Sequence, residues 1–488
     1  MSTTKVLTPT SRVLLGLARA DITPPVGIYH RLWGAARHDR STGVHRPLAG
    51  DVMVFGPADG SAGKAIVRAQ LDLCGLMQSQ YEDLKRALSE GGNLPRENVV
   101  ITFSHTHSFG WLVSGRSNLP GAEMIPPYLK ELGPKMQEAC RRAMANMQDA
   151  TITYAAGRCN MAANRDYWDE NMDNPMGRAR RGYACGFNPV APADDTVLVA
   201  RVADRSGRTV GTVVNYGCHP TTLAWDNTLI SPDYVGAMRE EVERATGAPC
   251  VFLLGACGDL GPRDGYTGDT AVADRNGRQV AYAALSALQS MGPLATDFEY
   301  QGPVVSGATL GAWAHVPLTG ERMKQSSRFA GGTYKVDIPL KPKPDRAKLQ
   351  AELKDWESRQ KAADAKGDKA EARNYGAYAE RARRWLTRID DLPSGTTYPF
   401  NFSAYRMGDA FWVTSGGEPY NLIQVELRRR FPNFTIMFSP LAGNMDVAYL
   451  LPKDRYGKGL YQEEPSSLGP GCLEKLIEAI SAKIEEMR

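Results

Sequence analysis

Residues 209–256 read TVGTVVNYGCHPTTLAWDNTLISPDYVGAMREEVERATGAPCVFLLGA, and this stretch indicates how the chain folds. Two runs rich in β-branched and apolar residues, 209–216 and 249–256, are predicted strands. The segment between them, 233–246, has the apolar spacing of a helix. Strands that alternate with helices are typical of α/β proteins, in which helices cover a sheet.

The same alternation continues through most of the chain. Further strands are predicted at 98–104, 196–203, 410–415 and 435–439, and further helices at 127–146, 274–290, 419–430 and from about residue 470 onward. We therefore expect an α/β fold with a mixed, largely parallel sheet covered by helices. Residues 343–388 are rich in Ala, Lys, Glu and Arg, which predicts a charged helical insertion. A solvated cover is favoured over a partner-binding arm, because charge runs usually face water.

Length and charge limit the possible functions. A chain of 488 residues can form one large α/β unit or two domains. Its 58 basic and 54 acidic residues are spread out, which argues against nucleic acid as a partner. The sequence has no apolar run of bilayer length and no secretory stretch in residues 1–12, so a cytoplasmic protein without a transmembrane segment is expected. The eight scattered cysteines favour reduced thiols over one or two disulfides.

Histidine is scarce, and two of the seven histidines occur together in SHTHS (104–108), directly after a predicted strand. In an extended segment the side chains at i and i+2 point the same way, so His105 and His107 can approach one centre. Taken alone, the motif fits a metal site and a pair of structural histidines equally well.

Two further segments carry candidate ligands. His219 follows the strand 209–216, and Asp233 lies at the next helix start, where it can cap amides or orient an imidazole. Glu418 lies between a predicted strand and helix, beside two glycines; alternatively it only interacts with the helix dipole. These residues all follow predicted strand ends, the edge where α/β sheets form ligand crevices. Two imidazoles, a carboxylate and one more oxygen ligand fit a catalytic zinc site.

Several spaced motifs resemble the neutral/alkaline non-lysosomal ceramidase family. They are GLARADITPPVG (16–27), SHTHS (104–108), CHPTTLAWDNTLISPD (218–233), GGEP (416–419) and NMDVAY (444–449) with a second tyrosine at Tyr461. The resemblance covers almost the whole chain, and the order of the motifs is its most specific feature. It implies a single ceramidase-like catalytic domain over 1–488, of bacterial type, without the C-terminal immunoglobulin-like domain of longer members.

The resemblance also implies roles for individual residues. His105, His219, Glu418 and Tyr449 are the implied ligands of one Zn²⁺ ion, with Asp446 as a chemically acceptable substitute for Tyr449. The residues implied to face the substrate are His107, Arg165 and Tyr461. Without the resemblance, Arg165 would be interpreted as a surface arginine beside two aspartates.

One departure from the family bears on the mechanism. Where some members have a serine in the GDLGP loop (258–262), this chain has Gly261, so metal-activated water is the expected nucleophile. The sequence predicts a zinc-dependent hydrolase of an amide (N-acyl) bond in a small molecule other than long-chain ceramide. A zinc-dependent esterase or lactonase, and a noncatalytic binding protein that retains the fold, are the alternatives.

Overall fold

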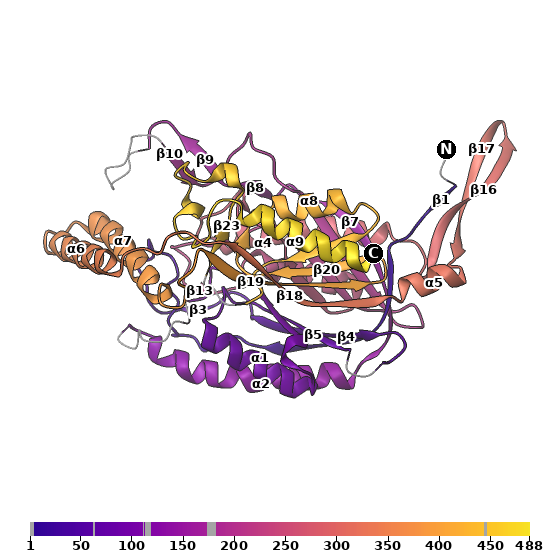
Figure 1. Cartoon of the computed structure of the whole chain (residues 1–488), viewed down its shortest axis with the longest axis horizontal. Coiled ribbons are helices and arrows are strands. Elements are labelled where there is room, and N and C mark those ends of the chain that lie inside the picture. Colours follow the sequence, from indigo (N-terminus) through magenta and orange to yellow (C-terminus); the bar gives the residue numbers. More distant parts are fainter. Residues whose placement is uncertain (1–3, 62–63, 111, 113–118, 173–181, 444–446) are drawn as a thin grey trace.

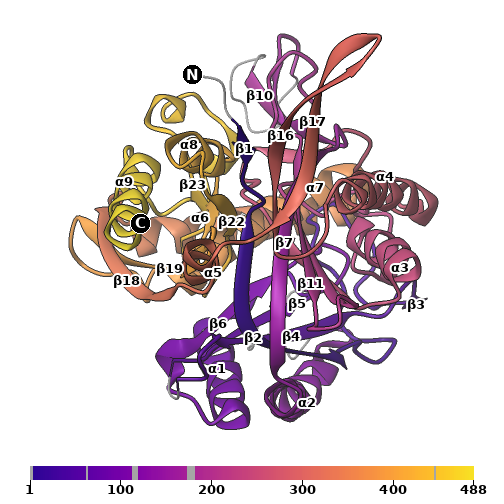
Figure 2. The same ribbon diagram turned by 90° about the vertical axis from the view of Figure 1, so that its right-hand side faces the viewer.

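A computed structural model describes the whole chain except residues 1–3, 62–63, 111, 113–118, 173–181 and 444–446. The body has four layers, in which two sheets pack face to face and helices cover the outer face of each sheet (Figures 1 and 2). The class is α/β, as the sequence predicts. The layering differs from the expected single covered sheet.

The larger sheet is mainly antiparallel. Its strands, in spatial order, are β14 (Cys250–Leu254), β12 (Thr209–Tyr216), β11 (Thr196–Ala203), β7 (Gln148–Arg158), β2 (Thr10–Asp21), β4 (Ala49–Pro57), β5 (Ile66–Leu71) and β6 (Val99–Phe103). The outermost pair at each edge is parallel, while the pairs between them are antiparallel. The prediction of a largely parallel sheet is therefore wrong. Short links such as 204–208, between β11 and β12, allow only an antiparallel return, since a parallel pair needs a long crossover.

Helices cover only one face of this sheet. They are α1 (Gln78–Gly92), α2 (Ile125–Ala145), α3 (Tyr234–Thr246) and α4 (Thr270–Gln289). In β4, Val52 and Val54 pack in the helix-side core, whereas Met53 and Phe55 pack in the core between the sheets. This division follows from the alternation of side chains along a strand.

The smaller sheet completes the sandwich. It contains β18 (Phe329–Pro339), β19 (Thr397–Met407), β20 (Ala410–Ser415) and β22 (Thr435–Ser439). Trp412 of β20 packs against Phe55 of the larger sheet, with the ring centroids 5.1 Å apart. The opposite face packs against α8 (Leu422–Arg430) and α9 (Cys472–Met487). Because the inner faces bury each other, helices are needed only on the outside.

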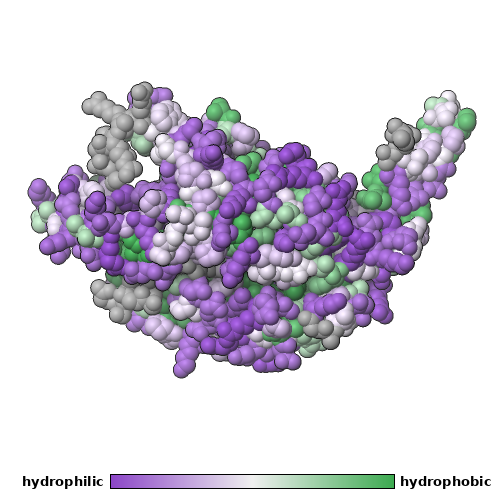
Figure 3. Space-filling model, in the orientation of Figure 1, coloured by the Kyte–Doolittle hydropathy of each residue, from purple (hydrophilic) through white to green (hydrophobic). Residues whose placement is uncertain are grey.

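Two segments project from opposite ends of the body (Figure 1). One is a helical hairpin of α6 (Arg346–Ala365) and α7 (Lys369–Arg388), within the segment expected to be a charged helical insertion. The other is an arm of β16 (Thr296–Ser306) and β17 (Ala308–Pro317), with β1 (Lys5–Val6) and α5 (Gly320–Ser326) at its base. Apolar side chains near the tip of the arm are exposed (Figure 3).

Short elements connect the layers. They are β3 (Gly43–Val44), β8 (Ala162–Asn164), β9 (Asp166–Asp169), β10 (Gly182–Cys185), β13 (Leu229–Ile230), β15 (Leu260–Pro262), β21 (Glu418–Pro419), β23 (Tyr449–Leu450) and the 3-10 turns Arg96–Asn98, Ala122–Met124, Lys453–Arg455 and Tyr461–Glu463. All eight cysteines are free thiols. Among the helices of the described ranges, none combines the length and apolarity that a bilayer crossing needs.

Candidate metal centre

Three predicted ligands from distant parts of the chain converge at one point. The side-chain ligand atoms of His105, His219 and Glu418 lie within 4.8 Å of one another, and all three residues are buried. Glu418 Oε2 is 2.9 Å from His219 Nε2 and 3.4 Å from His105 Nε2. His105 and His219 lie in the loops after β6 and β12, and Glu418 begins the short strand β21 after β20, so the centre lies where the two sheets meet.

Both imidazoles are oriented by backbone carbonyls that the sequence did not point to. His105 Nδ1 lies 2.6 Å from the carbonyl oxygen of Cys74, and His219 Nδ1 lies 2.7 Å from that of Cys257. A carbonyl only accepts hydrogen bonds, so each Nδ1 carries the proton and donates it. The Nε2 atoms are therefore the ones that face Glu418 and that remain for an ion, an arrangement typical of metal-binding histidines.

The backbone at His105 is not extended, contrary to the expectation behind the i, i+2 argument. Strand β6 ends at Phe103, and His105 has φ +66°, a left-handed conformation that non-glycine residues rarely adopt. Its N–H donates to Leu73 O at 3.0 Å, which holds this bend. Strained backbone of this kind is often found at functional sites.

His107 lies beside the centre. Its ring centroid is 4.8 Å from that of His105 and 5.9 Å from that of His219. Its Nε2 atom is buried and has no hydrogen-bond partner among the described residues. A buried polar atom without a partner is uncommon, so this nitrogen is a candidate for contact with a substrate or water.

Glu418 is positioned by backbone pairing with the segment that carries Tyr449. Strands β21 and β23 are parallel, with Glu418 opposite Tyr449, and Glu418 N donates to Ala448 O at 2.8 Å. The turn before Glu418 requires glycine, because Gly417 has φ +62° and a Cβ there would lie 2.7 Å from Ala448 O. Gly417 of the GGEP motif thus allows the close approach that the sequence suggested.

The charges at the centre suit a cation. Burial alone would raise the pKa of Glu418, but His105 and His219 hold it well below its usual value. Burial and the Arg165 guanidinium lower the pKa of His219 to about 4. Burial and the neighbouring His105 likewise lower the pKa of His107. Burial would lower the pKa of His105, but Cys74 and Glu418 raise it well above its usual value. At neutral pH the Glu418 carboxylate therefore lies beside a protonated His105 and a neutral His219, and a metal ion that binds both imidazoles would displace the His105 proton.

Arg165 is buried, so the interpretation as a surface arginine is wrong. Only 3% of Arg165 is exposed, and its Nε and Nη2 donate to Gly258 O at 3.2 and 2.7 Å. Its Cζ atom lies 5.4 Å from the ring centroid of Tyr449. The ring of Tyr449 is 6.3 Å from that of His219 and 5.9 Å from that of Tyr461, which is half exposed.

Asp233 and Asp446 were the two further carboxylates considered near the metal centre. Asp233 caps α3: its Oδ1 accepts from Tyr234 N at 2.6 Å, and its Oδ2 accepts from Leu223 N at 2.8 Å. This is the capping role that the sequence offered as one of two possibilities. Asp446 lies outside the described residues.

The GDLGP loop supports the centre from behind. The Asp259 carboxylate accepts two hydrogen bonds from Asn421, one from the backbone N and one from Nδ2, both at 2.6 Å. A Cβ on Gly258 would lie 2.5 Å from Glu418 O, so the two loops touch through their backbones. The sequence indicated a loop here but not its contact with the Glu418 loop.

A group of aromatic side chains next to His107 was also missed by the sequence analysis. The ring centroid of Trp33 is 5.3 Å from that of His107, and Trp225 and Tyr266 pack against Trp33 at 6.1 and 5.8 Å. These rings come from three separate loops. No periodic pattern connects them, so only the tertiary structure reveals the group.

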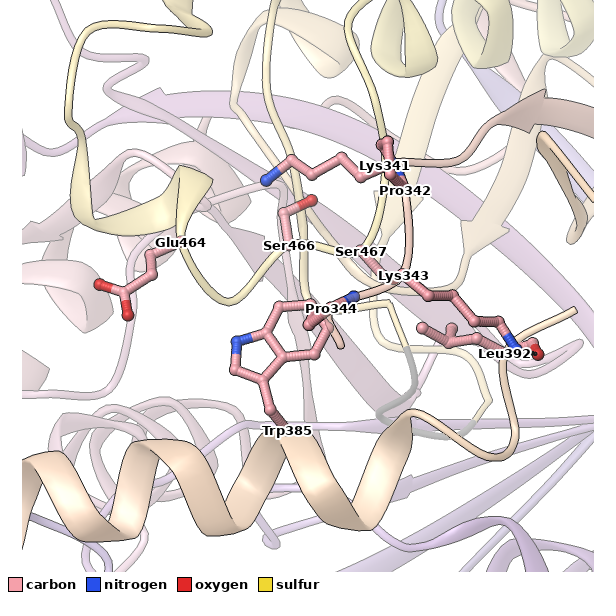
Figure 4. A pocket seen from close by; sticks show the side chains of 9 residues that line it. All are labelled: Lys341, Pro342, Lys343, Pro344, Trp385, Leu392, Glu464, Ser466 and Ser467. Carbon is pink, nitrogen blue, oxygen red and sulfur yellow. Dashed lines mark hydrogen bonds between the residues drawn. The ribbon is translucent and has the colours of Figure 1, made fainter. Parts of the chain in front are cut away.

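A cavity of about 250 Å³ lies between α7 and residues 464–467 (Figure 4). Trp385 and two lysines are among the residues that line it. Lys341 and Lys343 donate to the carbonyl oxygens of Glu463 and Leu392, respectively. Because its cations are already engaged and its lining contains none of the converging ligands, the cavity is not assigned to the metal centre.

The donor set fits a metal ion of the zinc type. Two neutral imidazole nitrogens and one carboxylate oxygen are a known ligand combination of catalytic zinc, which keeps a further position open. The fixed Nδ1 hydrogen bonds are the observation that supports this fit, because they preset the orientation of both rings before any ion binds.

Known proteins with related sequences and folds are neutral ceramidases. A family model described as "Neutral/alkaline non-lysosomal ceramidase, N-terminal" matches residues 13–251. The neutral ceramidase of Mycobacterium tuberculosis is 27% identical over 282 residues, which cover 54% of this chain and 42% of that protein. The neutral ceramidase of Pseudomonas aeruginosa is 23% identical over 255 residues, which cover 51% and 36%, respectively. The matches thus span less than half of either relative.

Fold similarity extends further. The crystal structure of the Pseudomonas aeruginosa neutral ceramidase matches with a TM-score of 0.63 at 17% identity, covering 98% of this chain and 75% of that one. A structure described as "Ceramidase complexed with C2" matches with a TM-score of 0.62 at 16% identity, covering 98% and 76%. The family model over residues 13–251 and the two related sequences therefore support the neutral/alkaline non-lysosomal ceramidase family for this chain.

Proposed function

We propose that this protein is a zinc-dependent hydrolase that cleaves an amide (N-acyl) bond in a substrate other than long-chain ceramide. One observation carries the proposal. His105 and His219, each fixed through Nδ1 by a backbone carbonyl, direct their Nε2 atoms toward the Glu418 carboxylate. The related proteins are named neutral ceramidases, and a ceramidase cleaves an amide bond, which supports an amide rather than an ester as the substrate.

The ion would be held by His105, His219 and Glu418, with Tyr449 as the proposed fourth ligand. Glu418 and Tyr449 are held at a fixed separation by the β21–β23 pairing. A zinc ion bound there supplies Lewis acidity and a water-derived nucleophile at neutral pH. Gly261 offers no side-chain nucleophile of its own in the supporting loop.

Three residues around the centre are proposed to act on the substrate directly. His107 has a lowered pKa and a buried Nε2 without a partner, so it is suited to exchange a proton with the leaving amine. Tyr461 lies at the exposed side of Tyr449, where its hydroxyl can donate to the developing oxyanion. Arg165, packed over Tyr449, provides a fixed positive charge for a polar or anionic substrate group.

The position of the centre also bears on domain organisation. His105 and His219 follow strands of the larger sheet, and Glu418 follows β20 of the smaller one. Neither sheet could assemble the site alone. We therefore propose that residues 1–488 act as a single catalytic domain, in which the sandwich core between the sheets holds the centre together.

An activity screen tests the function. Purified protein with added zinc would be assayed on short soluble N-acyl amides, on matched esters and on long-chain ceramide in detergent. We expect turnover of short amides, little turnover of long-chain ceramide, and loss of activity in His105→Ala. Turnover of esters alone would make the protein an esterase. Efficient turnover of long-chain ceramide without activity on short amides would refute the substrate assignment.

A further inference from the structure

The aromatic group next to His107 consists of Trp33, Trp225 and Tyr266, here called the ring cluster. Trp33 meets the other two rings edge-on, with interplanar angles of 78° and 90°. Trp225 and Tyr266 are nearly parallel, at 15°, with centroids 6.4 Å apart. All three side chains are partly exposed. The cluster thus offers ring faces and edges next to a residue proposed to contact substrate.

The ring cluster is held in place by contacts that do not involve a ligand. Ala224 N donates to Thr267 O, and this hydrogen bond joins the residue before Trp225 to the residue after Tyr266. Arg384 of α7 donates to Leu32 O at 3.0 Å, next to Trp33. The helical hairpin therefore contacts the loop that carries Trp33. A preorganised aromatic surface loses little entropy when a ligand packs on it.

Two neighbouring rings at this surface each carry a polar atom without a partner. Trp33 Nε1 and His107 Nε2 are both buried without a hydrogen-bond partner in the described part of the chain. The indole N–H can only donate, so it requires an acceptor. Two orphan nitrogens on rings whose centroids are 5.3 Å apart indicate that a ligand carries a polar acceptor into this position.

The surrounding charges select among the ligands that aromatic surfaces bind. Aromatic clusters bind cations as well as flat rings. Here the Arg384 guanidinium is hydrogen-bonded to the Trp33 loop but is paired with Glu380 at 2.9 Å. The buried Arg165 lies near Tyr449 and acts on Tyr266 of the ring cluster, and its positive charge disfavours a cationic ligand. A neutral or anionic group with a planar ring is compatible with both the charge and the ring faces.

We propose that the substrate carries an aromatic ring close to its scissile bond, and that this ring packs on Trp33, Trp225 and Tyr266 while Trp33 Nε1 donates to an oxygen of the substrate. The inference rests on the proposed hydrolase function, because it places the reacting bond beside His107. It makes the ring cluster the specificity determinant of the site. An aromatic contact of this kind corresponds to roughly a tenfold preference over an aliphatic group of similar size.

Binding of two small acids tests the inference without relying on turnover. Phenylacetate and hexanoate would be titrated calorimetrically into the zinc-supplemented protein. We expect phenylacetate to bind about tenfold more tightly than hexanoate. Trp33→Leu and Trp225→Leu should each reduce this preference to less than about twofold. Trp33→Phe should retain the preference for the ring but weaken phenylacetate binding, because it keeps the ring and removes the N–H.

The matched control is Trp313→Leu, which removes a tryptophan of the β17 arm and should leave the preference unchanged. Equal or tighter binding of hexanoate would overturn the inference, as would an unchanged preference in both Trp33→Leu and Trp225→Leu. Hydrolysis is scored separately with phenylacetyl and hexanoyl amides of one amine. Selective phenylacetate binding without any amide hydrolysis would reject the proposed function and keep the aromatic site. Amide hydrolysis with no preference for the phenylacetyl compound would keep the proposed function and reject the aromatic site.

Discussion

Glu418 lies directly opposite Tyr449 in the parallel β21–β23 pair, so backbone hydrogen bonds set the distance between the two proposed oxygen ligands. The histidines are constrained in a similar way, through the carbonyl oxygens of Cys74 and Cys257. Main-chain contacts thus fix most of the geometry of the centre. Side-chain substitutions should therefore change its occupancy without dismantling the fold.

Metal content is the most direct prediction. We expect about one zinc per chain in the wild type, and loss of the ion in His105→Ala, His219→Ala and Glu418→Gln, because removal of any one of these proposed ligands leaves too few to hold it. Elemental analysis after dialysis measures it. His315→Ala, in the β17 arm, is the control and should retain zinc. Unchanged stoichiometry in the three ligand variants would show that the ion is bound elsewhere.

Individual residues show how far the sequence could predict this structure. The bounds of β11, β12, β20 and β22 agree with the predicted strands, since each is a short run of β-branched or aromatic residues. The long strand β7 was not predicted, because its polar and glycine-containing sequence becomes a strand only between β2 and β11. Tertiary pairing, rather than local propensity, also decides that the large sheet is mainly antiparallel.

The candidate site shows a similar division. The pattern of His105, His219 and Glu418 in the sequence indicated a common centre, because each follows a strand end. The backbone carbonyls that orient the imidazoles carry no side-chain signal and could not be predicted. Trp33 was missed for another reason: it comes from a loop with no apolar periodicity, and its proximity to His107 depends on long-range packing.

Close backbone contact behind the centre gives a second prediction. Gly258→Ala places a Cβ 2.5 Å from Glu418 O, and a backbone atom cannot move away without shifting β21. We expect a destabilisation on the order of 1–3 kcal/mol together with reduced zinc retention. Thermal unfolding and elemental analysis measure the two effects. Gly320→Ala, where an added Cβ meets nothing within 4 Å, should leave both unchanged. A Gly258→Ala protein with normal stability and metal content would contradict the contact.

The buried Asp259 predicts a pH dependence of stability. Burial raises its pKa to about 7, whereas an unfolded aspartate titrates near pH 3.9. Between these values the folded chain holds a proton that the unfolded chain has released. The stability contribution is therefore full below about pH 4 and is lost as the pH rises toward 7.

Asp259→Asn should remove this dependence, since the amide does not titrate and the Asn421 side chain can turn to accept from it. Compared with the variant, the wild type should lose unfolding free energy with rising pH by on the order of 1 kcal/mol per pH unit in this window. Urea unfolding at several pH values measures the difference. Parallel pH profiles of wild type and Asp259→Asn would show that the carboxyl titrates normally.

Tyr461 and Tyr449 should separate catalysis from metal binding. If the Tyr461 hydroxyl donates to the oxyanion, the hydrogen bond strengthens only as charge develops, so Tyr461→Phe should lower kcat more than it raises KM and should keep the zinc. A fully preorganised donor contributes on the order of 10²-fold to 10³-fold. Tyr461 is 50% exposed, so a smaller loss of kcat, about 10-fold to 100-fold, is expected.

Tyr449→Phe removes a proposed ligand oxygen and should instead weaken zinc retention. Kinetics of both variants, with zinc content measured on the same samples, distinguish the two roles. Full activity of a folded Tyr461→Phe would leave this tyrosine as a packing residue beside Tyr449, and the oxyanion would then depend on the ion and His107 alone.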